Sequence, residues 1–133
     1  MIDQVSVVTT FLEALAAGDS RSAVDLLDPD VEWRNTGLPT LRGRRATGAL
    51  LGMEKRGVGF GYEMHAVAVS ADGDSVLTDR TDWITLGRLR SEFWVRGTFT
   101  LRDGKIVVWD DAFSMGGFAA GTLRGLVRAV LPR

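Results

Sequence analysis

The stretch SVLTDRTDWITL, residues 75–86, alternates apolar and polar side chains as a β-strand does. Successive side chains of a strand point to opposite faces, so one face carries Val76, Thr78, Arg80, Asp82, Ile84 and Leu86. That face is the more apolar of the two. The pattern therefore predicts a strand that brings an arginine and an aspartate into the protein interior.

Three further stretches around this strand show the same alternation. They are residues 60–70, 91–101 and 105–115, and the sequences ADGD, GRLR and RDGK separate the strands from one another. The last two of these separators are typical of hairpin turns. The order of strands and turns predicts a long antiparallel sheet.

Helical spacing of apolar residues marks the first part of the chain and its end. A first helix is predicted from Val5, Val8, Phe11, Leu12 and Leu15, with Gly18 as its stop and Asp19 as the next N-cap. There follow a short helix at 20–27, a short strand and turn at 30–39, a helix at 43–57, and a last helix with the apolar stripe Phe118, Leu123, Leu126, Val127 and Val130. Helices placed before a curved sheet predict an α+β fold, a cone in which helices cover the concave side around a deep pocket.

The composition narrows the class of protein. With 133 residues the chain has the length of one domain, so residues 1–133 are predicted to form a single domain. A formal net charge of -1 favours neither nucleic acid nor an anionic membrane as partner. The absence of cysteine and the single histidine argue against a metal site. Without an export signal or an apolar run near about 18 residues, the sequence predicts a cytoplasmic protein that does not insert into membranes.

Two other predicted strands also direct polar groups inward. One face of residues 105–115 carries Val107, Trp109, Asp111, Phe113 and Met115, and one side of residues 31–35 carries Val31, Trp33 and Asn35. A buried carboxylate without a partner is costly, so Arg80, Asp82 and Asp111 are predicted to form one cluster. The cluster is either a structural ion network or an acid–base pair, because two carboxyls on one guanidinium can hold protons unequally.

Three motifs carry a resemblance to a known family. The Arg-x-Asp at 80–82, VVWDDAF at 107–113 and EWRN at 32–35 together resemble the limonene-1,2-epoxide hydrolase family of NTF2-like and SnoaL-like cone folds, over nearly the whole chain. The resemblance implies hydrolysis of a small apolar epoxide in one step, without metal or cofactor. It makes Asp111 the base that activates water, Asn35 a holder of that water, Asp82 the acid and Arg80 the bridge between the carboxyls.

The sequence departs from the family pattern at two places. Trp33 stands where family members have a tyrosine, and an indole can donate a hydrogen bond but cannot accept one. The segment 110–114 reads DDAFS, where Arg-Asp-Tyr-Phe-Asp is usual. Two alternatives therefore stay open beside hydrolysis: an epoxide-opening cyclase that uses a hydroxyl of its substrate, and a non-catalytic protein that binds a hydrophobic ligand.

Large apolar residues are available to line the predicted pocket. The candidates are Trp33, Leu50, Met53, Phe60, Met64, Phe93, Val95, Phe99, Phe113 and Phe118. The glycine-rich stretch at 57–61 is predicted to be a turn at the pocket mouth. Trp83 and Trp94 fall on the outer face of the sheet, and that aromatic face favours a homodimer.

Overall fold

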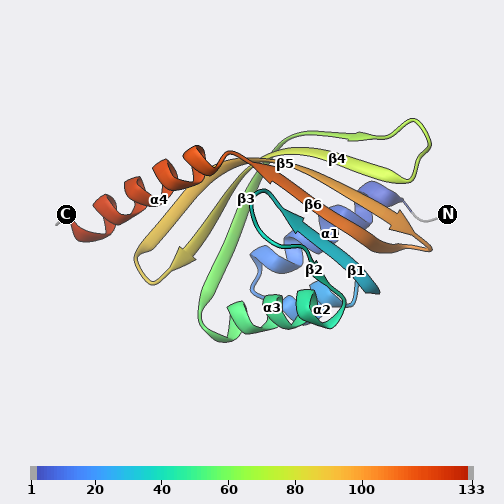
Figure 1. Ribbon diagram of the computed structural model, residues 1–133, viewed down its shortest axis with the longest axis horizontal. Helices are drawn as coiled ribbons and strands as arrows, with labels where there is room; N and C mark the ends of the chain where they lie inside the picture. Colours follow the sequence, from blue (N-terminus) through green and yellow to red (C-terminus); the bar gives the residue numbers. More distant parts are fainter. Residues whose placement is uncertain (1–2, 132–133) are drawn as a thin grey trace.

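A curved six-stranded sheet with helices against its concave side makes up the fold, as Figure 1 shows. This computed structural model describes residues 3–131. Its elements are α1 (Gln4–Ala16), α2 (Ser20–Val24), β1 (Leu27–Asn35), β2 (Leu41–Arg42), α3 (Arg44–Lys55), β3 (Val58–Val69), β4 (Ser75–Leu86), β5 (Leu89–Arg102), β6 (Lys105–Phe113) and α4 (Met115–Val130). The strand order is β2-β1-β6-β5-β4-β3. The pair β1 and β6 is parallel and the other pairs are antiparallel, so the sheet is mixed.

The first helices follow their sequence signals except at one boundary. Side chains of Asp3 and Asp19 cap α1 and α2 by accepting backbone N–H groups. Of the predicted apolar residues of α1, Val5 is partly buried and the other four are buried. The second helix was predicted to run through residue 27, but α2 ends at Val24. Leu27 instead pairs with Ile106 of β6, so this parallel pairing lengthens β1 at the expense of the helix.

The core lies between α1 and the concave face of the sheet. The ring of Phe11 meets Phe99 and Trp109 edge-on, with centroids 6.1 and 4.9 Å away. The inward faces of β4 and β5 are those predicted. In β6, however, Ile106 is buried and Val107 is not, because the register between β5 and β6 shifts at this point.

The glycine-rich stretch at 57–61 is strand and not the turn that was predicted. Only Gly57 has the positive φ of a turn, at 83°, and β3 begins at the next residue. A Cβ at Gly61 would collide with the ring of Trp83, which lies across it from β4. The glycine therefore makes room for a cross-strand tryptophan.

The last helix also packs differently from the prediction. The residues of α4 that are buried are Gly121 and Gly125, and a Cβ at either would overlap the backbone carbonyl of Glu92 or Arg90 in β5. Leu123, Leu126, Val127 and Val130 of the predicted stripe are exposed. Small residues thus let the helix lie directly on the strand backbone, and these four larger residues face outward. None of the helices within residues 3–131 is both long and apolar enough to span a membrane.

Candidate active site

Arg80 lies at the centre of a buried polar cluster on the concave face. Its side chain is fully buried and donates from Nε and Nη2 to the two carboxylate oxygens of Asp82, at 2.9 and 2.8 Å. Nη2 also donates to Oδ1 of Asp111, at 3.1 Å. The three residues that the sequence placed on inward faces of β4 and β6 thus meet, and one guanidinium contacts both carboxyls.

A second layer holds the guanidinium, and the sequence interpretation overlooked it. Nη1 of Arg80 donates to the hydroxyl of Thr78 at 3.0 Å, and that hydroxyl donates to the carbonyl of Gly97 at 3.1 Å. The alternation placed Thr78 on the inward face, two residues before Arg80, but no role was assigned to it. Gly97 also carried a signal, since a glycine in the middle of a strand often marks a close approach.

Burial and the neighbouring charges both shift the pKa values of the cluster. Burial raises the pKa of Asp111 to about 6, while the charge of Arg80 opposes this rise and that of Asp82 adds to it. Burial alone would lower the pKa of Arg80, but the charges of Asp111 and Asp82 raise it above its ordinary value. Arg80 therefore stays charged, and Asp111 changes its protonation near pH 6.

Two tryptophans and Asn35 lie next to Asp111. Asn35 and Trp33 of β1 pair in register with Asp111 and Trp109 of β6. The two indoles stack with centroids 4.4 Å apart and planes 7° apart. Their Nε1 atoms are buried and form no hydrogen bond with any of residues 3–131. Asn35 is thus the amide neighbour of Asp111, and Trp33 stands beside it without a hydroxyl.

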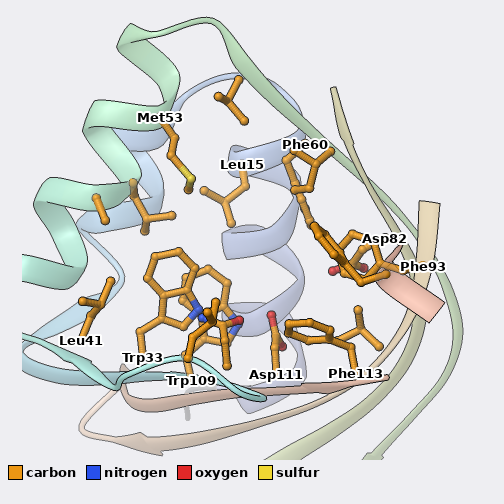
Figure 2. Close-up of a pocket in the computed structure, with 18 of the residues that line it drawn as sticks. Leu15, Trp33, Leu41, Met53, Phe60, Asp82, Phe93, Trp109, Asp111 and Phe113 are labelled. Carbon is orange, nitrogen blue, oxygen red and sulfur yellow. The ribbon is translucent and has the colours of Figure 1, made fainter. Parts of the chain in front are cut away.

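An apolar cavity of about 580 Å³ opens in front of the cluster. Asp82, Asp111 and Asn35 line it, whereas Arg80 lies behind the carboxyls. Figure 2 shows Asp111 between Trp109 and Phe113, with Phe60 and Phe93 toward Asp82. The polar groups therefore lie at one wall of an otherwise apolar cavity.

Most of the residues predicted for the pocket line this cavity. Those that do so are Trp33, Leu50, Met53, Phe60, Phe93, Val95, Phe113 and Phe118. Met64 and Phe99 are absent from its wall, because Met64 lies further along β3 and packs against the buried core, to which Phe99 itself belongs. Lining residues that were not predicted include Leu15, Leu38, Pro39, Leu41 and Ile84. Leu38, Pro39 and Leu41 lie in a turn and a two-residue strand, which have no periodicity to reveal their direction.

The polar groups on the outer face of the sheet are separate from this buried cluster. His65 shares a hydrogen bond of 2.8 Å with the hydroxyl of Thr81, and Trp94 donates to Asp79. Both pairs are exposed, and neither reaches the cavity. Within residues 3–131 no three His, Cys, Asp or Glu side chains are grouped so that they could hold a metal ion.

Comparison with known proteins connects this chain to a family. Residues 2–124 match the family described as the limonene-1,2-epoxide hydrolase catalytic domain. The chain is 41% identical over 125 residues to epoxide hydrolase EphG of Mycobacterium tuberculosis, an alignment that covers 94% of this chain and 83% of EphG.

Solved structures extend the comparison. An LEH-like epoxide hydrolase of M. tuberculosis superposes with a TM-score of 0.88 at 40% identity, over 97% of this chain and 96% of that one. The epoxide hydrolase/cyclase-like enzyme SalBIII, which has a role in pyran ring formation in the polyether salinomycin, superposes with a TM-score of 0.74 at 20% identity, over 85% and 92% of the two chains. At that identity the likeness concerns the fold alone. Together with the curved sheet, these matches confirm the predicted α+β cone.

Proposed function

Since this chain belongs to the limonene-1,2-epoxide hydrolase family and is an epoxide hydrolase, we propose that it adds water in one step to an apolar epoxide of terpenoid, polyketide or sterol type. The product is a vicinal diol. The observation that carries the proposal is the pair of carboxyls, bridged by a buried guanidinium, at one wall of an apolar cavity.

The net charge of the cluster supports an acid–base role. Arg80 supplies one positive charge, and Asp82 and Asp111 would supply two negative charges if both were ionised. An uncompensated buried charge costs several kcal/mol, so the cluster is favoured when one carboxyl holds a proton. An acid and a base therefore coexist in the same site, as opening an epoxide with water requires.

In the proposed reaction, a water next to Asn35 attacks one epoxide carbon while the bond from that carbon to the epoxide oxygen breaks. Asp111 accepts a proton from the water, and Asp82 gives a proton to the departing oxygen, so no charged alkoxide is released. The net result is one proton moved from Asp82 to Asp111. Arg80 contacts both carboxyls and offsets the negative charge of whichever is ionised.

The hydrolase is tested with terpenoid, polyketide-type, aromatic and sterol epoxides in ¹⁸O-labelled water. We expect one labelled oxygen in each diol, and a loss of turnover of about 10² to 10⁴-fold in Asp82→Asn and in Asp111→Asn. The proposal is wrong if the wild type opens none of these epoxides, or if both variants keep full activity.

Azide separates the roles of the two carboxyls. Azide is a nucleophile that needs no base, so it should restore ring opening, as an azido alcohol, in Asp111→Asn. It should not do so in Asp82→Asn, which lacks the acid. The reverse assignment, with Asp82 as base, predicts rescue of Asp82→Asn alone.

A cyclase is the second candidate, and Trp33 is the residue that favours it. Its indole offers no acceptor to help align a water, so a hydroxyl of the substrate could take the place of water beside Asp111. An internal hydroxyl transfers its proton to Asp111 as water would, and the product is a ring ether. Such a product carries no label from ¹⁸O water, which distinguishes it from hydrolysis in the same assay.

The homodimer and the cytoplasmic location remain proposals. The outer face of the sheet exposes Leu77 and Trp94, with 44% and 54% of their surfaces accessible, which supports association through this face. Sedimentation velocity of Trp94→Asp should then give monomer, whereas Leu126→Asp on α4 should stay dimeric. A wild type that sediments as a monomer contradicts the proposal. The cysteine-free sequence fits a reducing compartment, and fractionation of the native host would test that location.

A further inference from the structure

Gly97 occupies a special position in the middle of the sheet. On β5 it pairs with Thr78 of β4 on one side and with Asp111 of β6 on the other. Side chains of paired residues stand next to one another on the same face, so a side chain at 97 would stand between Thr78 and Asp111. The guanidinium of Arg80 fills that place instead, and its contacts reach both neighbours.

The available space decides what residue 97 can be. A Cβ there would lie 2.5 Å from Nη1 of Arg80, 2.7 Å from Oδ1 of Asp111 and 2.9 Å from Oγ1 of Thr78. These distances are shorter than van der Waals contact, and β5 cannot retreat because it is hydrogen-bonded to strands on both sides. Glycine inside a strand is otherwise unfavourable by roughly 0.5–1 kcal/mol relative to alanine, so its presence needs a cause such as this one.

We propose that Gly97 is a positioning residue of the active site: its missing side chain forms a slot through which Arg80 reaches Asp111, and its carbonyl orients Thr78, which fixes the guanidinium. The carbonyl accepts from the Thr78 hydroxyl, and the same hydroxyl accepts from Nη1. With Nη1 fixed in this way, Nη2 is directed at both carboxyls. The effect on turnover rests on the proposed function, but the geometry of the slot does not.

A methyl group at position 97 has a definite chemical consequence. It displaces the guanidinium from Asp111 and so removes the nearby positive charge that favours the ionised carboxyl. A charge at this distance commonly moves the pKa of a carboxyl by about 1–3. The pKa of Asp111 should therefore rise further in Gly97→Ala, and fewer molecules should carry an ionised base at neutral pH.

The test that does not depend on activity is a ¹³C NMR titration of the carboxyl of Asp111, assigned by its loss in Asp111→Asn. We expect the midpoint to rise by about one pH unit or more in Gly97→Ala, and in the same direction in Thr78→Val, while Thr78→Ser keeps the wild-type value. Gly61→Ala is the matched control, since it also introduces a methyl group against a side chain, but on the outer face. Its midpoint should not move.

Activity gives the second readout. With an epoxide that the wild type opens, kcat in Gly97→Ala should fall by about ten-fold or more with little change in KM, and the acid limb of the pH profile should move to higher pH. A folded Gly97→Ala with an unchanged Asp111 midpoint overturns the proposal. If that variant does not fold, an unchanged midpoint in Thr78→Val overturns it. An inactive wild type would refute the proposed reaction, and the titrations would still decide the role of Gly97.

Discussion

Both faces of β4 carry an aspartate, but the two aspartates have opposite surroundings. On the concave face Arg80 and Asp82 form a two-bonded ion pair from which solvent is excluded. On the convex face Asp79 accepts a hydrogen bond from Trp94 at an exposed position. In water such an outer pair contributes little, because the solvent screens charge and already satisfies both groups. Because they are buried, the charges of the inner face interact strongly with one another. A single substitution there should therefore change stability and activity more than a substitution on the outer face does.

The largest loss of stability and activity should come from Arg80→Met on the concave face. Without the guanidinium two carboxyls remain buried together, so we expect a loss of about 3–5 kcal/mol in the free energy of unfolding at pH 8, and no measurable turnover. Protonation of Asp111 on acidification removes one of the two negative charges, so the deficit should shrink toward pH 5. Urea denaturation at the two pH values measures this.

The control for that substitution is Arg96→Met on the outer face of β5, where the guanidinium stacks 4.5 Å from the ring of Trp94. It should change stability by no more than about 0.5–1 kcal/mol. Equal losses of unfolding free energy in the two variants would mean that burial does not make the inner charges more important than the outer ones.

Asp111→Asn should separate activity from stability. Its pKa of about 6 in the folded protein lies above the value of about 3.9 expected when unfolded. Between these values the folded state binds more protons, so the wild type loses stability as pH rises from about 4 to about 6. The variant lacks that loss and should be at least as stable as the wild type at pH 8, although turnover falls by about 10² to 10⁴-fold.

Asp110→Asn is the matched control, because Asp110 is the next residue of β6 and pairs with Thr98 on the outer face. Turnover should be retained in this variant. Urea titrations and rate measurements are made in parallel on both variants. A loss of activity in Asp110→Asn as well would contradict the distinction between the inner and outer faces.

A smaller effect, which varies continuously with pH, is expected in kcat/KM of the wild type. Asp111 must be ionised to accept a proton, so kcat/KM should fall about ten-fold for each pH unit below about 6. The acid limb should be steep in the wild type and unchanged in outer-face variants such as His65→Gln. A rate that stays flat down to pH 4.5 would exclude Asp111 as the base.

The smallest effect is expected from Trp33→Tyr. A hydroxyl at this place can both donate to and accept from a water, and one such hydrogen bond of about 1 kcal/mol corresponds to about a five-fold faster addition of water. Trp94→Tyr on the outer face should leave the rate unchanged. Diol formation is measured by ¹⁸O incorporation, and a slower Trp33→Tyr would indicate that the stack with Trp109 matters more than the hydroxyl.

The inner face was predictable because strand alternation is a local rule. Counting by two placed Arg80, Asp82 and Asp111 inward, and the sheet then brought them together. The rule fails where a register shift interrupts it, as at Val107, and where packing depends on distant backbone, as for Gly121 in α4. Hydrophobic periodicity predicted an apolar stripe there, but close approach of the helix to β5 buried the glycines and left most of that stripe exposed.

The slot at Gly97 also bears on how this protein can be varied. Every other amino acid that could replace glycine there carries a Cβ, so position 97 has no conservative exchange, and alanine already enters the space of the guanidinium. The wall of the cavity is different: Leu38 and Met53 reach into open volume from a turn and a helix. Libraries that aim to change substrate preference should therefore mutate such wall positions and leave glycine fixed at 97.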